Sequence, residues 1–228
     1  MPLSGDERAR QARQLLVPGM AEGQEWLAAA RVRVVGAGKP AGPALVALVQ
    51  AGVGRIWVDD PEDAGPGDEG GWLLPPGAAG TSRAGAAVAR LSALSRFARV
   101  ERYPTGGVPT ATLVCTPTIA EALVAAEQAR RAGVPHVVLE PDGEAGSVVA
   151  IPPGAPCYAC ARSTMSAGRA TQAGSGAVLG CLAAAELVLA MAAPAEVVGR
   201  RIEVVRGLLA SRPTVRLAGC VCGGGDGP

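Results

Sequence analysis

Short apolar runs alternate with longer segments of helical periodicity along the first two thirds of the chain. The apolar runs predict buried strands, and the periodic segments predict helices. The expected strands are residues 31–35, 55–58, 98–103, 112–115 and 136–140, and the expected helices are residues 41–51, 83–95 and 119–132. Strands that alternate with helices of about 10–15 residues predict an α/β protein with a doubly wound, mostly parallel, Rossmann-like sheet.

The pattern changes after Gly146. Short apolar runs at 147–151, 201–206 and 214–217 surround a long apolar segment. These runs predict an antiparallel extension of the sheet. Residues 61–80, dominated by Gly, Pro and acidic residues, are expected to form a loop.

We expect one continuous domain with three parts. Residues 1–30 read as an amphipathic helical arm, because charged and apolar residues alternate there at helical spacing. Residues 31–150 are expected to form a nucleotide-binding, Rossmann-like core. Residues 151–228 are expected to form a C-terminal extension that carries a site of four cysteines.

The longest apolar segment, residues 177–195, is nearly long enough to span a membrane. It contains Glu186 and is rich in Ala and Gly, which favours a buried helix instead. The N-terminus is charged and has no apolar signal region, so we expect a cytoplasmic protein without a membrane partner.

Composition limits both the makeup of the core and the possible binding partners. Hydrophobic residues make up 49% of the chain and aromatic residues only 3%, so the core must consist mainly of Ala, Val and Leu. The net charge is +1 and no basic stripe is present, which argues against a broad nucleic-acid-binding surface.

A glycine turn follows the first strand. The sequence GAGKPAG fits the pattern G-x-G-x-x-A, in which Gly36 permits the turn, Gly38 lets the backbone approach a phosphate and Ala41 allows close packing of helix on strand. Asp59 ends the second strand, where a carboxylate accepts hydrogen bonds from a ribose. The pattern predicts nucleotide binding, with a purely structural turn as the alternative.

Two neighbouring residues make this turn unusual. Pro40 removes one N–H donor from the loop. Lys39, the only lysine of the chain, either compensates with a charge directed at a phosphate or points to solvent.

Four cysteines form two close pairs, Cys157 with Cys160 and Cys220 with Cys222. Four thiolates at these separations can hold one zinc ion tetrahedrally and leave no open coordination position. The sequence therefore predicts a structural zinc site, with a disulfide or free thiols as the alternative. The other two cysteines, Cys115 and Cys181, are expected in the core, and His136 is expected to be a partly buried structural residue.

Taken together, these segments resemble the ThiF/MoeB family, the bacterial relatives of ubiquitin-activating enzymes. The matching segments occur in the family's order over nearly the whole chain: RQARQLLVPG, GQEWLAAARVRVVGAG, AGVGRIWVDD, APCYAC, GAVLGCLAAAELVLA and GCVCG. The resemblance implies a dimer that binds ATP and magnesium and adenylates the C-terminal carboxylate of a small ubiquitin-like carrier protein or a peptide.

The resemblance also implies roles for individual residues. Cys157, Cys160, Cys220 and Cys222 match the family's zinc ligands, and Asp59 matches its ribose-binding residue. Arg13 matches an arginine that reaches across the dimer interface to the partner's ATP. Arg83 stands where the family has a phosphate-binding lysine and keeps its charge.

The departures from the family concern the chemistry. The family's second aspartate after the second strand, its asparagine and its arginine fall on Pro61, Gly67 and Gly70, and its magnesium-binding aspartate falls on Pro117. The connection between Tyr103 and Thr112 is also shorter than usual. Loss of one charge-stabilising group typically slows catalysis by roughly 10² to 10³.

Four functions remain open from the sequence. In the first, the chain is a divergent adenylyltransferase. Arg13, Lys39 and Arg83 would supply positive charge to the phosphates, and Asp59, Asp60 or the acidic residues 62, 63 and 68 would hold magnesium. Alternatively, it is a non-catalytic subunit of a homodimer or of a heterodimer with a ThiF-like partner. A third function is a peptide- or carrier-binding scaffold in biosynthesis, and a fourth is binding of NAD or FAD alone.

Overall fold

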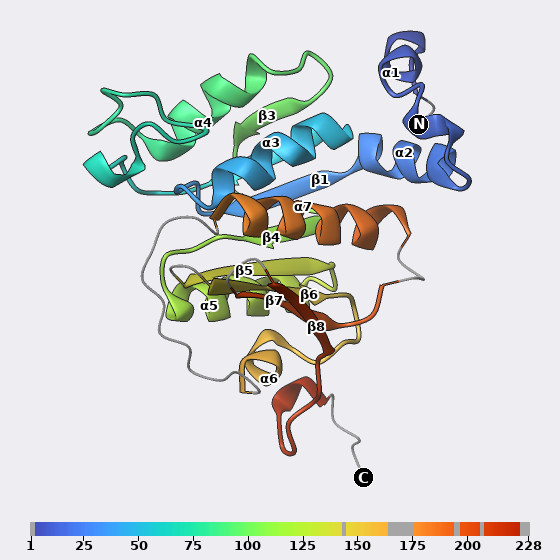
Figure 1. Cartoon of the computed structure of the whole chain (residues 1–228), viewed down its shortest axis with the longest axis vertical. Helices are drawn as coiled ribbons and strands as arrows, with labels where there is room; N and C mark the ends of the chain where they lie inside the picture. The colour runs from blue at the N-terminus through green and yellow to red at the C-terminus, as the bar shows by residue number, and fades with distance from the viewer. Residues whose placement is uncertain (1–2, 143–144, 164–175, 194–196, 206–207, 224–228) are drawn as a thin grey trace.

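The computed structural model describes residues 3–142, 145–163, 176–193, 197–205 and 208–223 (Figure 1). Eight strands form one sheet in the order β3-β2-β1-β4-β5-β6-β7-β8, which runs from top to bottom in Figure 1. The strands are β1 (Arg31–Val35), β2 (Arg55–Asp59), β3 (Arg99–Arg102), β4 (Ala111–Val114), β5 (His136–Asp142), β6 (Ala145–Ile151), β7 (Arg200–Val205) and β8 (Leu208–Pro213).

The first five strands are parallel, and β6, β7 and β8 continue the sheet antiparallel. The predicted α/β fold with an antiparallel C-terminal extension is therefore confirmed. The helices are α1 (Gly5–Arg10), α2 (Met20–Ala29), α3 (Ala41–Ala51), α4 (Arg83–Ser92), α5 (Ile119–Arg131), α6 (Tyr158–Ser163) and α7 (Gly176–Ala192), with short 3-10 turns at Gln14–Leu16, Pro66–Asp68 and Val221–Gly223.

The helices cover the sheet in two layers. On one face, α3 lies beside α7, and α4 packs on β2 and β3 (Figure 1). On the other face, α5 packs on β4 and β5, and α6 packs on β6. Within β1, Val32 and Val34 are fully buried towards α3, while Arg31, Arg33 and Val35 alternate onto the opposite face.

Local sequence signals set the ends of the helices. Helix α3 ends at Gly52, whose φ of +90° closes the helix in the left-handed region. Helix α5 begins with a capping box, in which the Thr118 side chain accepts from the Glu121 N–H and the Glu121 carboxylate accepts from the Thr118 N–H. Gly52 thus ends α3 just before the amino end of β2, and the capping box starts α5 just after the carboxyl end of β4.

Two expectations about the C-terminal third were wrong. The last strand is β8 at Leu208–Pro213, whereas residues 214–217 form no strand, because the Leu217 N–H donates to the Cys160 Sγ at 3.3 Å instead of joining a ladder. Cys181 is exposed on α7, so it is not a core residue, although Cys115 is buried as expected. A membrane crossing would need a longer apolar helix than any that the structure describes, α7 included.

Candidate functional site

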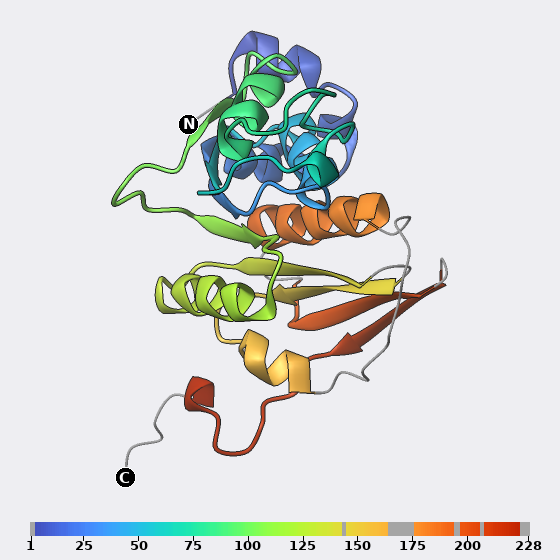
Figure 2. The same cartoon turned by 90° about the vertical axis from the view of Figure 1, so that its left-hand side faces the viewer.

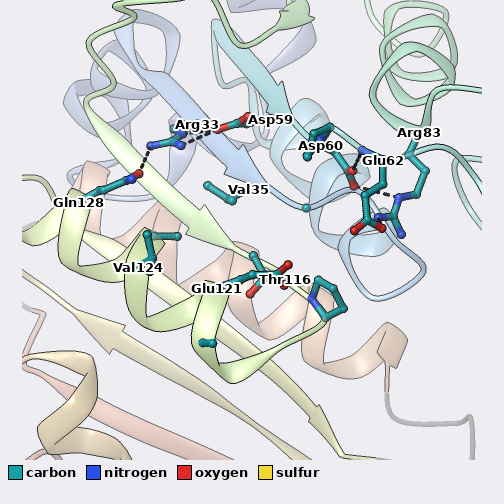
Figure 3. A pocket seen from close by; sticks show the side chains of 15 residues that line it. Arg33, Val35, Asp59, Asp60, Glu62, Arg83, Thr116, Glu121, Val124 and Gln128 are labelled. Atoms are coloured by element: carbon teal, nitrogen blue, oxygen red, sulfur yellow. Dashed lines mark hydrogen bonds and ion pairs between the residues drawn. The ribbon is translucent and has the colours of Figure 1, made fainter.

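A pocket of about 410 Å³ lies where β1, β2 and β4 end (Figure 3). Its other wall is α5. This is the edge at which open α/β sheets bind ligands, at the point where the strand order reverses between β1 and β4. The lining residues are Arg33, Val35, Gly36, Asp59, Asp60, Pro61, Glu62, Arg83, Thr116, Pro117, Ala120, Glu121, Val124, Ala125 and Gln128.

The predicted glycine turn forms one side of this pocket. Gly36 has a φ of +89°, which favours glycine, and its N–H donates to the Asp59 carbonyl oxygen at 2.9 Å. The next N–H, that of Ala37, donates at 2.7 Å to the Asp60 carboxylate. A carboxylate of the chain itself therefore occupies a donor that a phosphate would use in a nucleotide-binding turn.

The N-terminus of α3 also has few free backbone N–H donors. The Ala41 N–H donates to the Gly38 carbonyl oxygen at 3.0 Å, and the Gly42 N–H donates to the Lys39 carbonyl oxygen at 3.3 Å. Pro43 has no N–H. The four positions whose N–H groups are free at an ordinary helix N-terminus are here residues 40–43, and Pro40 also has no N–H, so all four donors are already used or missing.

Arg83 joins three carboxylates beside the turn. Its Nε lies 3.1 Å from Asp60 Oδ2, and its guanidinium pairs with Glu62 (Figure 3). Its Nη1 lies 3.7 Å from Asp68 Oδ2. The Arg83 side chain is 12% exposed and that of Asp60 only 2% exposed. Arg83, the predicted phosphate-binding residue, lines the pocket, but acidic side chains already surround its charge.

Asp59, the predicted ribose ligand, is held by Arg33. The Arg33 Nε donates to Asp59 Oδ2 at 2.8 Å, and Arg33 Nη1 donates to Gln128 Oε1 on α5 at 3.0 Å (Figure 3). The Arg33 guanidinium also stacks on the Tyr103 ring, 4.5 Å from its centre. Sequence reasoning missed Arg33, although a charged residue within the buried first strand is a visible signal.

The other residues predicted for the turn do not line the pocket. Lys39 is exposed and does not line it; a Cβ added to Gly71 would meet Lys39 Cγ at 3.5 Å, so the lysine lies over the loop that follows β2. Gly38 lies beneath Arg83 and Asp68. Ala41 is fully buried at the start of α3, as close helix–strand packing requires.

Arg13 is exposed in the N-terminal arm and does not line the pocket of its own chain.

The positions at which this chain departs from the ThiF/MoeB pattern divide into two groups. Pro61 and Pro117 line the pocket, whereas Gly67 and Gly70 lie in the loop after β2 outside it.

The four predicted metal ligands converge at the other end of the molecule. Their sulfur atoms all lie within 4.8 Å of one another, with 3.6 Å between Cys157 and Cys220 and 3.6 Å between Cys160 and Cys222. Four sulfurs at about 2.3 Å from a tetrahedral zinc ion are about 3.8 Å apart, so the arrangement fits this metal. Burial raises the pKa of the Cys160 thiol to about 12, and a bound cation would be needed to hold it as a thiolate.

His136 is a buried structural residue, as expected, and is 2% exposed. Its Nδ1 lies 3.1 Å from the Val134 carbonyl oxygen, so this nitrogen carries the proton and donates. Burial lowers the pKa of His136 to about 4. The ring is therefore neutral at pH 7.

No protein-family model matches the chain, and no curated protein sequence matches it. Solved structures do match. Escherichia coli MccB with ATP is 17% identical, with a TM-score of 0.76 over 92% of this chain and 73% of that chain. Escherichia coli MccB with MccA is 17% identical, with a TM-score of 0.78 over 97% and 77%.

PaaA is 16% identical, with a TM-score of 0.72 over 95% of this chain and 76% of that chain. Identities this low identify a shared fold and leave the chemistry open. The chain has a fold of the ThiF/MoeB type, which it shares with MccB and PaaA.

Proposed function

We propose that this chain is a non-catalytic protein of the adenylyltransferase fold that binds a peptide or small carrier protein without activating it. One observation carries the proposal: the groups that would bind a phosphate are already engaged within the chain. The Ala37 N–H donates to the buried Asp60 carboxylate, and the Arg83 guanidinium forms an ion pair with the same carboxylate. A triphosphate would have to displace that carboxylate to reach them.

The charge of the pocket supports the same conclusion. Two arginines and four carboxylates line it, which leaves a net charge of −2; they are Arg33, Arg83, Asp59, Asp60, Glu62 and Glu121. Adenylation requires positive charge around the α-phosphate, supplied by magnesium and by cationic side chains. A negatively charged pocket raises the energy of a triphosphate there instead.

The described residues offer magnesium no cluster of three or more carboxylates. Within the part of the chain that the structure describes, the cysteine quartet is the only group of three or more His, Cys, Asp or Glu side chains whose ligand atoms converge. The carboxylates of Asp60, Glu62 and Asp68 surround Arg83 instead. Zinc remains the proposed ion for the quartet, where it would fasten the C-terminal tail to α6.

A peptide is the proposed binding partner because of the fold. Solved structures of MccB contain MccA, including its N-formylated form. The position of the pocket at the carboxyl edge of the sheet fits a chain end that enters from solvent. The same proposal includes a dimer, formed either by two copies of this chain or by this chain and a ThiF-like partner. In either dimer, Arg13 would reach the pocket of the partner.

Adenylation by a divergent site is the second candidate. Both Arg33 nitrogens that contact Asp59 use Oδ2, so Oδ1 is available to accept from a ribose hydroxyl at the rim of the pocket. Arg13 from a second copy and Lys39 would then supply the missing positive charge. This arrangement would restore ATP and magnesium as cofactors.

Two measurements separate the candidates. Calorimetric titration with ATP–Mg²⁺, with NAD and with FAD tests binding, and ATP–pyrophosphate exchange with peptides and carrier proteins encoded beside the gene tests chemistry. The non-catalytic proposal expects no exchange above the rate without protein. Exchange that Asp59→Ala or Lys39→Ala abolishes would overturn it in favour of adenylation, and tight NAD or FAD binding would favour the dinucleotide alternative.

A further inference from the structure

The sheet is covered unevenly on its second face. Three of the four parallel connections contain a helix, namely α3, α4 and α5, whereas β3 joins β4 through an extended loop without one (Figure 2). Parallel strands are normally covered by helices on both faces. On the second face, α5 packs on β4 and β5 and reaches β1 only at its carboxyl end, where Arg33 bonds Gln128. Among the described elements, no helix packs closely on the amino ends of β1, β2 and β3 on this face.

Three arginines stand side by side on this uncovered face. Arg31 of β1 pairs in register with Arg55 of β2, and Arg55 pairs in register with Arg99 of β3. Neighbouring strands lie about 4.8 Å apart, so the three side chains start at that interval. Like charges placed directly opposite each other destabilise a sheet.

The next row of side chains, one step nearer the pocket, shows on which face of the sheet the arginines lie. It consists of Arg33, Trp57 and Glu101, again in register. The contact of Arg33 with Tyr103 and the contact of Trp57 with the same ring, at 5.8 Å between ring centres, place both rows on the side of the β3–β4 loop.

Only one arginine of the row has a carboxylate partner among the described residues. The Arg99 Nε pairs with Glu101 at 2.6 Å. The Arg31 Nε donates to the Val108 carbonyl oxygen at 2.9 Å, and the Arg55 guanidinium lies 6.0 Å from the centre of the Trp57 ring. Neither contact neutralises a charge, so two adjacent guanidinium groups keep their full positive charge.

We propose that this arginine row binds an acidic helical segment of a partner protein. Carboxylates three or four residues apart on a helix are about 5–6 Å apart at Cβ, which matches the interval between adjacent strands. Guanidinium groups bind carboxylates through two parallel hydrogen bonds, so a glutamate pair on one helix face can satisfy Arg31 and Arg55 together.

A nucleic acid fits this face less well. Single strands bind through bases that stack on exposed aromatic rings. Trp57 is only 5% exposed, and the Tyr103 ring is covered by Arg33.

The row lies at the amino ends of the strands, whereas the pocket lies at their carboxyl ends. The two sites are therefore separate, and the acidic partner is independent of the proposed function of the pocket. A partner bound at the row would cover the face that the β3–β4 loop leaves open.

Fluorescence anisotropy with two labelled synthetic helical peptides tests the proposal. One carries glutamates at i and i+4 over several turns, and the other carries glutamine at the same positions. The full chain should bind the glutamate peptide and not the glutamine peptide. Raising the salt concentration from about 0.05 M to about 0.3 M should weaken binding, because exposed charges are screened.

Variants locate the site. Arg31→Gln combined with Arg55→Gln should weaken binding by about tenfold, the effect of two exposed ion pairs. Arg90→Gln, at an exposed arginine of α4 on the other side of the sheet, is the matched control and should change it less than about twofold. The lysine versions of the row variants keep the charge, should fold like the original chain, and should show an intermediate loss.

Three outcomes would overturn the proposal. The first is equal binding of the two peptides, and the second is an effect of Arg90→Gln as large as that of the row variants. The third is displacement of the glutamate peptide by a single-stranded oligonucleotide that binds more tightly. If the binding of that oligonucleotide required Arg31 and Arg55, the face would be a nucleic-acid-binding surface.

Discussion

Gly36 and Cys115 are in direct backbone contact. A Cβ atom on Gly36 would lie 2.5 Å from the Cys115 carbonyl oxygen, closer than any side chain can approach. The contact joins the turn after β1 to the end of β4. The glycine is therefore required by the packing of the sheet itself, whatever the pocket binds.

Gly36→Ala should destabilise the fold by roughly 2 kcal/mol or more, because it combines a left-handed backbone with a clash against backbone atoms. Gly38→Ala is the control, since a Cβ there would meet nothing nearer than Arg83 Nη1 at 3.7 Å. Urea unfolding measures both. Equal stability of the two variants would contradict the packing role of Gly36.

Arg83→Gln should destabilise the chain by about 3 kcal/mol, because it leaves the buried Asp60 carboxylate without its cationic partner. Arg102→Gln is the control: Arg102 is exposed, and its side chain bonds Ser82. Thermal unfolding measures the difference. If Arg83→Gln abolished ATP binding and left stability unchanged, Arg83 would be a phosphate ligand and the non-catalytic proposal would fail.

Freshly purified protein should contain one zinc ion per chain by elemental analysis. Cys160→Ser should lose the metal and lower the melting temperature by roughly 5–10 °C, because metal binding stabilises only the folded chain. Cys181→Ser changes an exposed cysteine outside the quartet and should keep both the metal and the stability. Well under one zinc ion per chain in the original protein would count against the site.

Stability should fall between pH 6.5 and pH 4, in part because of His136. Burial lowers its pKa from 6.5 to about 4, so in this window the unfolded chain binds a proton that the folded chain does not. The effect is present at pH 7 and is lost as the pH falls, by at most roughly 3 kcal/mol. Carboxylates titrate in the same window, so a variant is needed to isolate the histidine.

His136→Asn provides that variant, because its amide can still donate to the Val134 carbonyl oxygen. The difference in unfolding free energy between pH 7 and pH 4.5 should be smaller for the variant than for the original chain. The same difference in both proteins would show that His136 does not contribute.

The regular elements and the cysteine quartet could be predicted from the sequence because their signals are local. Val32 and Val34 mark a buried strand by alternation, and two close cysteine pairs indicate shared coordination before any contact is known. Pro43 was an available signal against phosphate binding, because it removes a donor from the first turn of α3.

Other features depend on where a side chain points and on which residues it contacts, and a sequence does not supply this information. Asp59 and Asp60 are equivalent acids by sequence, yet Asp59 is paired with Arg33, while Asp60 is buried beneath the glycine turn. Strand β8 was missed because its residues are exposed on both faces and show no alternation. Its position depends on pairing with β7.

A metal at the quartet would have a topological effect. Cys157 and Cys160 stand before α7 and the last two strands, and Cys220 and Cys222 stand after them. Coordination by all four would make the intervening chain a closed ring. A single backbone cut within that ring would then leave the two fragments tethered by the ion, in addition to the packing of α7 on α3 and the pairing of β7 with β6. A chelator would remove the tether, so a nicked protein should come apart at a lower urea concentration without its metal than with it.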